Sequence, residues 1–98
     1  MGKFDELIKS ERPTLVDFYA TWCGPCKMMS PLLEEVAREL GESSKIIKVD
    51  IEKNKDAAVQ YGIRSVPTLI LFKEGEIVWR QSGLPPKNLI TESIKKFI

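Results

Sequence analysis

Both cysteines of the chain, Cys23 and Cys26, are separated by two residues and stand where an apolar run gives way to a helical pattern. The run Thr14–Ala20 is apolar on both faces except at Asp17, which is typical of a strand covered by helices on both sides of a sheet. From residue 26 to 40 apolar residues recur every three or four positions, which predicts a helix. A buried strand followed by such a helix indicates an α/β fold, with the two thiols where the strand ends.

Periodicity and turn residues predict the other elements of one domain, which we place at residues 1–98. In chain order we expect a helix over 4–10, a strand over 14–20, a helix over 26–40, a strand over 46–51, a short helix over 56–61, strands over 68–73 and 76–82, and a helix after Pro85-Pro86. Asn54 is expected to cap the short helix. The last helix is expected to bury one apolar stripe, formed by Leu89, Ile90, Ile94, Phe97 and Ile98.

The composition of the chain argues against several classes of function. The chain has no histidine, so any proton transfer must use carboxylates, thiols or lysines. A net charge of +1 offers no electrostatic footprint for nucleic acid or an anionic membrane. No stretch approaches the roughly 20 apolar residues of a membrane span, and the start of the sequence lacks the apolar core of an export signal. We therefore expect a soluble, cytoplasmic protein without nucleic-acid or membrane partners.

The tetrapeptide Cys23-Gly24-Pro25-Cys26, between a strand and a helix, is a redox signature. At the helix N-terminus unpaired N–H groups favour a thiolate, so Cys23 is expected to attack and Cys26, one turn inside, to resolve. Pro25 suits the first helical turn, and Gly24 leaves the approach to Cys23 open. The alternatives are half of a zinc site, a permanent structural disulfide or two inert buried thiols. Zinc needs about four ligands, and with no third cysteine and no histidine we expect no metal.

Asp17 is the lone acid within the apolar run. Burial there raises the pKa of a carboxyl group by desolvation, so Asp17 is a candidate to hold or relay a proton near neutral pH. The alternative is an acid that pairs with a buried lysine and serves structure alone.

The run Val16–Lys27, VDFYATWCGPCK, resembles the active-site segment of the thioredoxin family. The resemblance extends over nearly the whole chain from about Phe4. Further matches are Pro31, Lys48, the run Tyr61–Thr68, Gly75 and Gly83. It implies a thioredoxin fold, with a central mixed sheet of about four strands flanked by helices on both faces. It also implies a thiol-disulfide oxidoreductase that reduces disulfides in client proteins and is itself reduced by a thioredoxin reductase. We expect a monomer with no cofactor.

The resemblance also assigns roles to single residues. It implies that Asp17 accepts the proton of Cys26 and that Lys48 is the partner of Asp17. The alternative for Lys48 is a lysine on the surface without a functional role. It implies a cis bond between Val66 and Pro67, where sequence alone makes trans the default, so that the backbone of Val66 can pair with a client strand. The expected docking surface consists of Trp22, Gly24, Pro25, Val66, Pro67, Gly83 and Leu84. A core position for Trp22 is the alternative.

Three departures from the family pattern bear on function. Tyr19 stands where tryptophan is common, the family's first edge strand is expected to be missing, and Pro85-Pro86 follows Gly83. A missing strand would leave a sheet edge open to pairing between molecules. Two other functions compete on the same fold: a thiol oxidase or isomerase, and an adaptor subunit that binds partners through the surface around Trp22 and Pro67.

Overall fold

A computed structural model describes residues 2–98. Its elements are α1 (Gly2–Ile8), β1 (Thr14–Tyr19), α2 (Gly24–Leu40), the 3-10 turn η1 (Gly41–Ser43), β2 (Lys45–Asp50), α3 (Lys55–Gln60), β3 (Thr68–Lys73), β4 (Glu76–Ser82) and α4 (Lys87–Lys95). Every helix and strand expected from the sequence is present, and the differences lie at the ends. The first helix begins two residues earlier than expected and ends at Ile8 instead of continuing to residue 10.

The four strands form one mixed sheet in the order β2-β1-β3-β4. β1 runs parallel to β2 and antiparallel to β3, and β3 and β4 form an antiparallel hairpin. The two inner strands, β1 and β3, are buried at five of their six positions, which explains their apolar sequences. β2 forms one edge of the sheet, and Lys48 is exposed on it. An exposed lysine on an edge strand opposes pairing with another chain.

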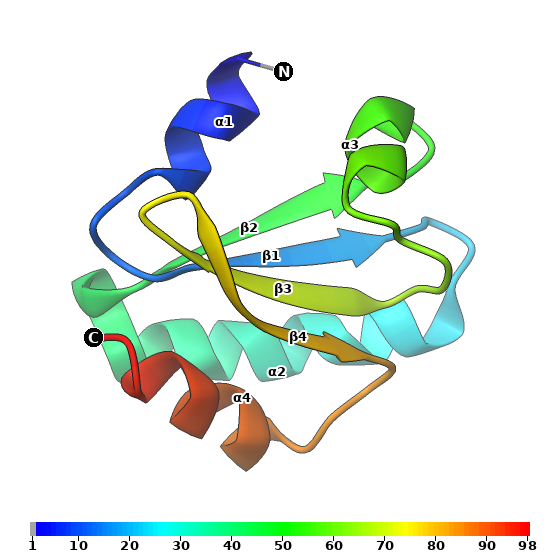
Figure 1. The fold of residues 1–98 in the computed structure, drawn as a ribbon. Coiled ribbons are helices and arrows are strands. Elements are labelled where there is room, and N and C mark those ends of the chain that lie inside the picture. Colours follow the sequence, from blue (N-terminus) through cyan, green and yellow to red (C-terminus); the bar gives the residue numbers. More distant parts are fainter. Residues whose placement is uncertain (1) are drawn as a thin grey trace.

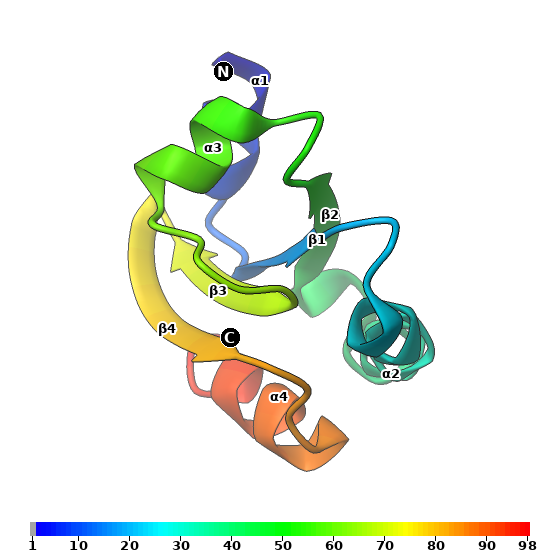
Figure 2. The same ribbon diagram turned by 90° about the vertical axis from the view of Figure 1, so that its right-hand side faces the viewer.

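Helices cover both faces of the sheet, α2 and α4 on one and α1 and α3 on the other (Figures 1 and 2). Because successive strand residues point to opposite faces, β1 contributes Leu15 to the core under α2 and α4 and Val16 to the core under α1 and α3. The expected mixed sheet with helices on both faces is thus confirmed.

Helix α2 begins at Gly24, two residues before the start expected from periodicity. Cys23 occupies the N-cap position, and its Sγ accepts a hydrogen bond from the backbone N–H of Cys26 over 3.2 Å. Pro25 falls in the first turn, where its missing N–H needs no partner. At the other end Gly41 adopts a φ of 56°, which favours glycine and stops the helix.

Two local expectations are wrong. Asn54 lies at the N-cap of α3 but makes no capping bond with its side chain; its amide donates to the carbonyl oxygen of Asp50 instead. The apolar stripe of α4 is narrower than expected, because Ile90 and Ile94 are fully buried whereas Leu89 and Ile98 are exposed.

Three loops meet at one end of the sheet, on the right of Figure 1. They are the connection from β1 to α2, the segment between α3 and β3, and the connection from β4 to α4. Cys23 lies in the first, with Cys26 in the helical turn that follows it, Pro67 lies in the second and Gly83 in the third. The topology therefore gathers the predicted site residues from three distant parts of the chain.

Candidate active site

Cys23 and Cys26 form a disulfide across the first turn of α2, with their Cα atoms 5.3 Å apart. The two residues are almost equally buried, at 4% and 3% exposure. Burial therefore does not separate an attacking from a resolving cysteine in the oxidised form. The assignment of roles stays a prediction that rests on the place of Cys23 at the helix N-terminus.

An apolar shell surrounds the disulfide. Ala20 is buried against the cysteines, and Tyr19, Ile51 and Val66 pack around them. Val66 arrives from a segment some forty residues further along the chain, so tertiary packing places it beside the sulfur atoms. Such a shell excludes water from a reacting thiolate and keeps the resolving thiol dry.

The peptide bond between Val66 and Pro67 is cis, as the family resemblance implies. Within residues 2–98 the backbone N–H and C=O of Val66 make no hydrogen bond. The carbonyl of Pro67 accepts from the N–H of Gly83 over 2.9 Å. Pro67 itself is buried, so its side chain adds little exposed area to the expected docking surface.

Trp22 lies on the surface, with 66% of its area exposed, so the alternative of a core position is wrong. Its indole Nε1 donates a hydrogen bond to Glu52 Oε2 over 3.2 Å. The backbone N–H of Glu52 in turn donates to the buried carboxylate of Asp50 over 2.8 Å. Glu52 thereby fixes the indole beside the disulfide. The sequence analysis missed this residue, because no local pattern links it to Trp22.

The remaining residues of the expected docking surface are exposed. Gly24 and Pro25 lie on the outside of the first turn of α2, and Gly83 and Leu84 on the loop after β4. A Cβ atom added at Gly24 would meet nothing within 4 Å. The space next to Gly24, the residue after Cys23, is therefore open. We call the set Trp22, Gly24, Pro25, Val66, Gly83 and Leu84 the docking rim.

Asp17 is fully buried in the middle of β1. Neither oxygen of its carboxyl group has a hydrogen-bond partner within residues 2–98. Burial raises the pKa of Asp17 from 3.8 to about 6, and the positive charge of Lys48 opposes this rise. A carboxyl group with this pKa is largely ionised at neutral pH and remains a useful base.

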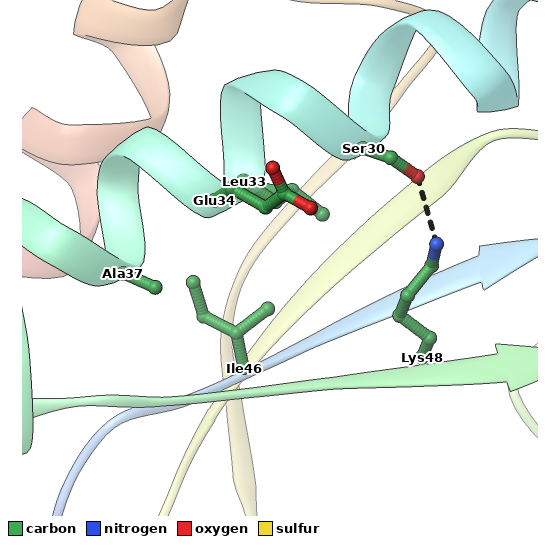
Figure 3. Close-up of a pocket in the computed structure, with 6 residues that line it drawn as sticks. All are labelled: Ser30, Leu33, Glu34, Ala37, Ile46 and Lys48. Carbon is green, nitrogen blue, oxygen red and sulfur yellow. Dashed lines mark hydrogen bonds between the residues drawn. The ribbon is translucent and has the colours of Figure 1, made fainter.

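Lys48 is the register partner of Asp17 on β2. Its Nζ, however, donates a hydrogen bond to Ser30 Oγ of α2 over 2.8 Å (Figure 3). The ammonium also lies 5.0 Å from the centre of the Tyr19 ring, within the range of a cation–π contact. Lys48 therefore acts on Asp17 through space rather than as a hydrogen-bond partner. Ser30 is a second residue that the sequence analysis missed.

Two further searches of the described residues concern metal binding and membrane-spanning helices. In residues 2–98 no three His, Cys, Asp or Glu side chains cluster in a way that could bind a metal ion. None of the helices in this range has the length and apolar character needed to cross a bilayer.

Comparisons with known proteins agree with this geometry. The thioredoxin family model matches residues 1–96. A thioredoxin from Bacillus subtilis is 45% identical over 89 residues, covering 91% of this chain and 86% of that protein. Another, from Pyropia yezoensis, is 45% identical over 93 residues, covering 95% and 87%. A mutant thioredoxin from Halobacterium salinarum superposes with a TM-score of 0.90 at 35% identity, covering 99% and 84%. Oxidised mitochondrial thioredoxin 3 from Saccharomyces cerevisiae gives 0.88 at 33%, covering 97% and 88%.

Proposed function

The chain belongs to the thioredoxin family and is a thiol-disulfide oxidoreductase, and we propose that it carries two electrons from a thioredoxin reductase to disulfides in client proteins. The observation that carries the proposal is the Cys23–Cys26 disulfide at the N-terminus of α2, beside an exposed docking rim. We treat residues 1–98 as one thioredoxin domain. A reducing compartment such as the cytoplasm suits its activity, because thiols there are kept reduced.

The reaction proceeds by two successive thiol-disulfide exchanges. In the reduced protein the thiolate of Cys23 attacks one sulfur of a client disulfide, which forms a mixed disulfide and releases the first client thiolate. Cys26 then loses its proton and attacks Cys23 Sγ. This step forms the Cys23–Cys26 disulfide and releases the second client thiolate. Two electrons have moved to the client, whose thiolates take up protons, and the reductase returns two electrons to the pair.

Asp17 accepts the proton of Cys26 in the second exchange. Three features support this role: the carboxyl group lies on the strand that leads into the cysteine loop, it is fully buried, and its oxygens are not engaged by another donor in residues 2–98. Its pKa of about 6 leaves it ionised at neutral pH and able to receive a proton. It later passes the proton to solvent or to a client thiolate.

Client recognition uses the docking rim. The free N–H and C=O of Val66 suit a client segment in an extended conformation, which would pair with them as a strand. Trp22 supplies an exposed aromatic surface of the kind that is enriched at protein interfaces. Hydrogen bonds to the main chain depend little on the side chains of the client, so this mode of binding suits a protein with many clients.

A coupled assay tests the proposal directly. Reduction of a protein disulfide is followed with a thioredoxin reductase, with its electron donor, and with each component left out. We expect turnover only when all components are present, and none when Cys23 and Cys26 are both replaced by serine. An adaptor subunit would keep its biological activity after this double replacement, whereas a reductase would lose it.

A further inference from the structure

Ser30 links the helix of the cysteine pair to the edge strand β2. It follows Cys26 by four residues, so the two side chains share one face of α2, one turn apart. Its hydroxyl accepts the hydrogen bond of Lys48 across the space between α2 and β2 (Figure 3). This space is a cavity of about 200 Å³, and its other walls are formed by Leu33, Glu34, Ala37 and Ile46.

Lys48 and Asp17 lie on the same side of the sheet. Register partners on neighbouring strands point their side chains to the same face, and α2 covers this face. The Lys48 ammonium thus has two acceptors on this side, the Ser30 hydroxyl and the Asp17 carboxylate. In the structure it is bound to Ser30, while both oxygens of Asp17 are unpaired within residues 2–98.

We propose that Ser30 is a positioning residue, which holds the Lys48 ammonium on α2 and so keeps the Asp17 carboxylate free to accept the proton of Cys26. The inference deepens the proposed function and rests on it, since it requires Asp17 to be the proton acceptor. A carboxylate that receives a direct hydrogen bond from an ammonium is stabilised in its charged form. It is then a weaker base and takes the thiol proton more slowly.

The charged groups around this site are few. Asp17 lies on the face of the sheet that α2 covers, and its register partners are Lys48 on β2 and the apolar Leu69 on β3. Lys48 faces Ser30 and the exposed Glu34 of α2, together with the ring of Tyr19. Glu34 carries a charge in the same cavity without bonding to Lys48, which makes it a matched control.

The first test follows the carboxyl carbon of Asp17 by NMR through a pH titration of the oxidised protein. Ser30→Ala is expected to release Lys48 to Asp17 and to lower the pKa of Asp17 below its value of about 6. Ser30→Thr, which keeps a hydroxyl, and Glu34→Gln are expected to leave it unchanged. In a Lys48→Met background Ser30→Ala is expected to have no effect. The proposal is overturned if Ser30→Ala leaves the pKa unchanged or raises it, or lowers it equally without Lys48.

The second test measures the pH profile of client reduction in a single turnover of the reduced protein. Ser30→Ala is expected to move the acid limb to lower pH and to slow the reaction roughly two- to fivefold at neutral pH, since a weaker base takes the proton less readily. A changed profile in Asp17→Asn with none in Ser30→Ala overturns the role of Ser30 alone. An unchanged profile in Asp17→Asn overturns the proton-transfer role of Asp17 itself.

Discussion

Gly83 donates its backbone N–H to the carbonyl oxygen of Pro67 over 2.9 Å, which ties the loop after β4 to the segment before β3. Pro67 follows Val66, which packs against the disulfide. The docking rim is therefore built on three segments that are held together by the sheet. If a client docks as a strand on Val66, as proposed, backbone positions rather than side chains would set its spacing from the sulfur atoms.

Asp17→Asn is expected to stabilise the oxidised protein at pH 8 more than at pH 4. The folded state raises the pKa of Asp17 from 3.8 to about 6, so it binds a proton more tightly than the unfolded chain. The free energy of unfolding therefore falls as pH rises through this interval and stays low above it. Between pH 4 and pH 8 the free energy of unfolding changes by about 2–3 kcal/mol, a change that Asn avoids because it does not titrate.

Urea unfolding of both proteins at pH 4 and pH 8 measures this difference. The unpaired amide of the Asn side chain adds a cost, but one that is the same at both pH values. An equal gain at both pH values, or a larger one at pH 4, would contradict the raised pKa of Asp17.

Cys26→Ser is expected to accumulate mixed disulfides between Cys23 and client proteins. The variant keeps the attacking thiol at the N-cap of α2 but has no thiol to resolve the intermediate. Non-reducing electrophoresis followed by mass spectrometry identifies the cysteine that is linked. Accumulation through Cys26 in the Cys23→Ser variant instead would reverse the two roles.

The direction of electron flow can be tested with glutathione. We expect the Cys23–Cys26 disulfide to persist in a mildly oxidising mixture of reduced and oxidised glutathione, because a reductase pair gives up its electrons readily. The fraction of reduced protein is measured by alkylation of free thiols after equilibration. A pair that is already reduced in this mixture would favour the oxidase or isomerase function.

Much of the site could be predicted because its residues carry local signals. The two cysteines and the proline between them stand at a junction of strand and helix, and Asp17 interrupts an apolar run. Trp22 at the end of that run was expected on the surface, and it lies there. Each of these residues either interrupts the hydrophobic pattern of its segment or marks the point where that pattern ends.

The residues that were missed act across elements. Glu52 bonds to a side chain 30 positions away and Ser30 to one 18 positions away. Such contacts depend on side-chain rotamers and on how distant segments pack together, and periodicity carries no information about them. Asn54 is a local case: its side-chain amide donates to the carbonyl oxygen of Asp50, the last residue of β2, instead of capping α3.

Trp22→Ala is expected to lower kcat/KM for protein clients about tenfold, which corresponds to about 1.4 kcal/mol of binding at an aromatic contact residue. Stability should change by less than about 1 kcal/mol, because the indole is largely exposed. Ile77→Ala is the control, since Ile77 is also exposed but lies at the opposite end of the sheet, where β4 leaves the hairpin turn. Equal losses in both variants, or none in Trp22→Ala, would argue against the docking rim.

The neighbouring residues Leu89 and Ile90 test how α4 packs. Ile90 is fully buried in the core shared with α2 and the sheet, whereas Leu89 is 41% exposed. Ile90→Ala leaves a cavity in a region that the sheet holds rigid, so it is expected to lower the free energy of unfolding by about 2–4 kcal/mol. Leu89→Ala removes a side chain of the same size from an exposed position. Its loss in the free energy of unfolding should therefore stay below about 1 kcal/mol. Chemical denaturation of the oxidised proteins separates the two, and similar costs would contradict an orientation of α4 that buries Ile90 and exposes Leu89.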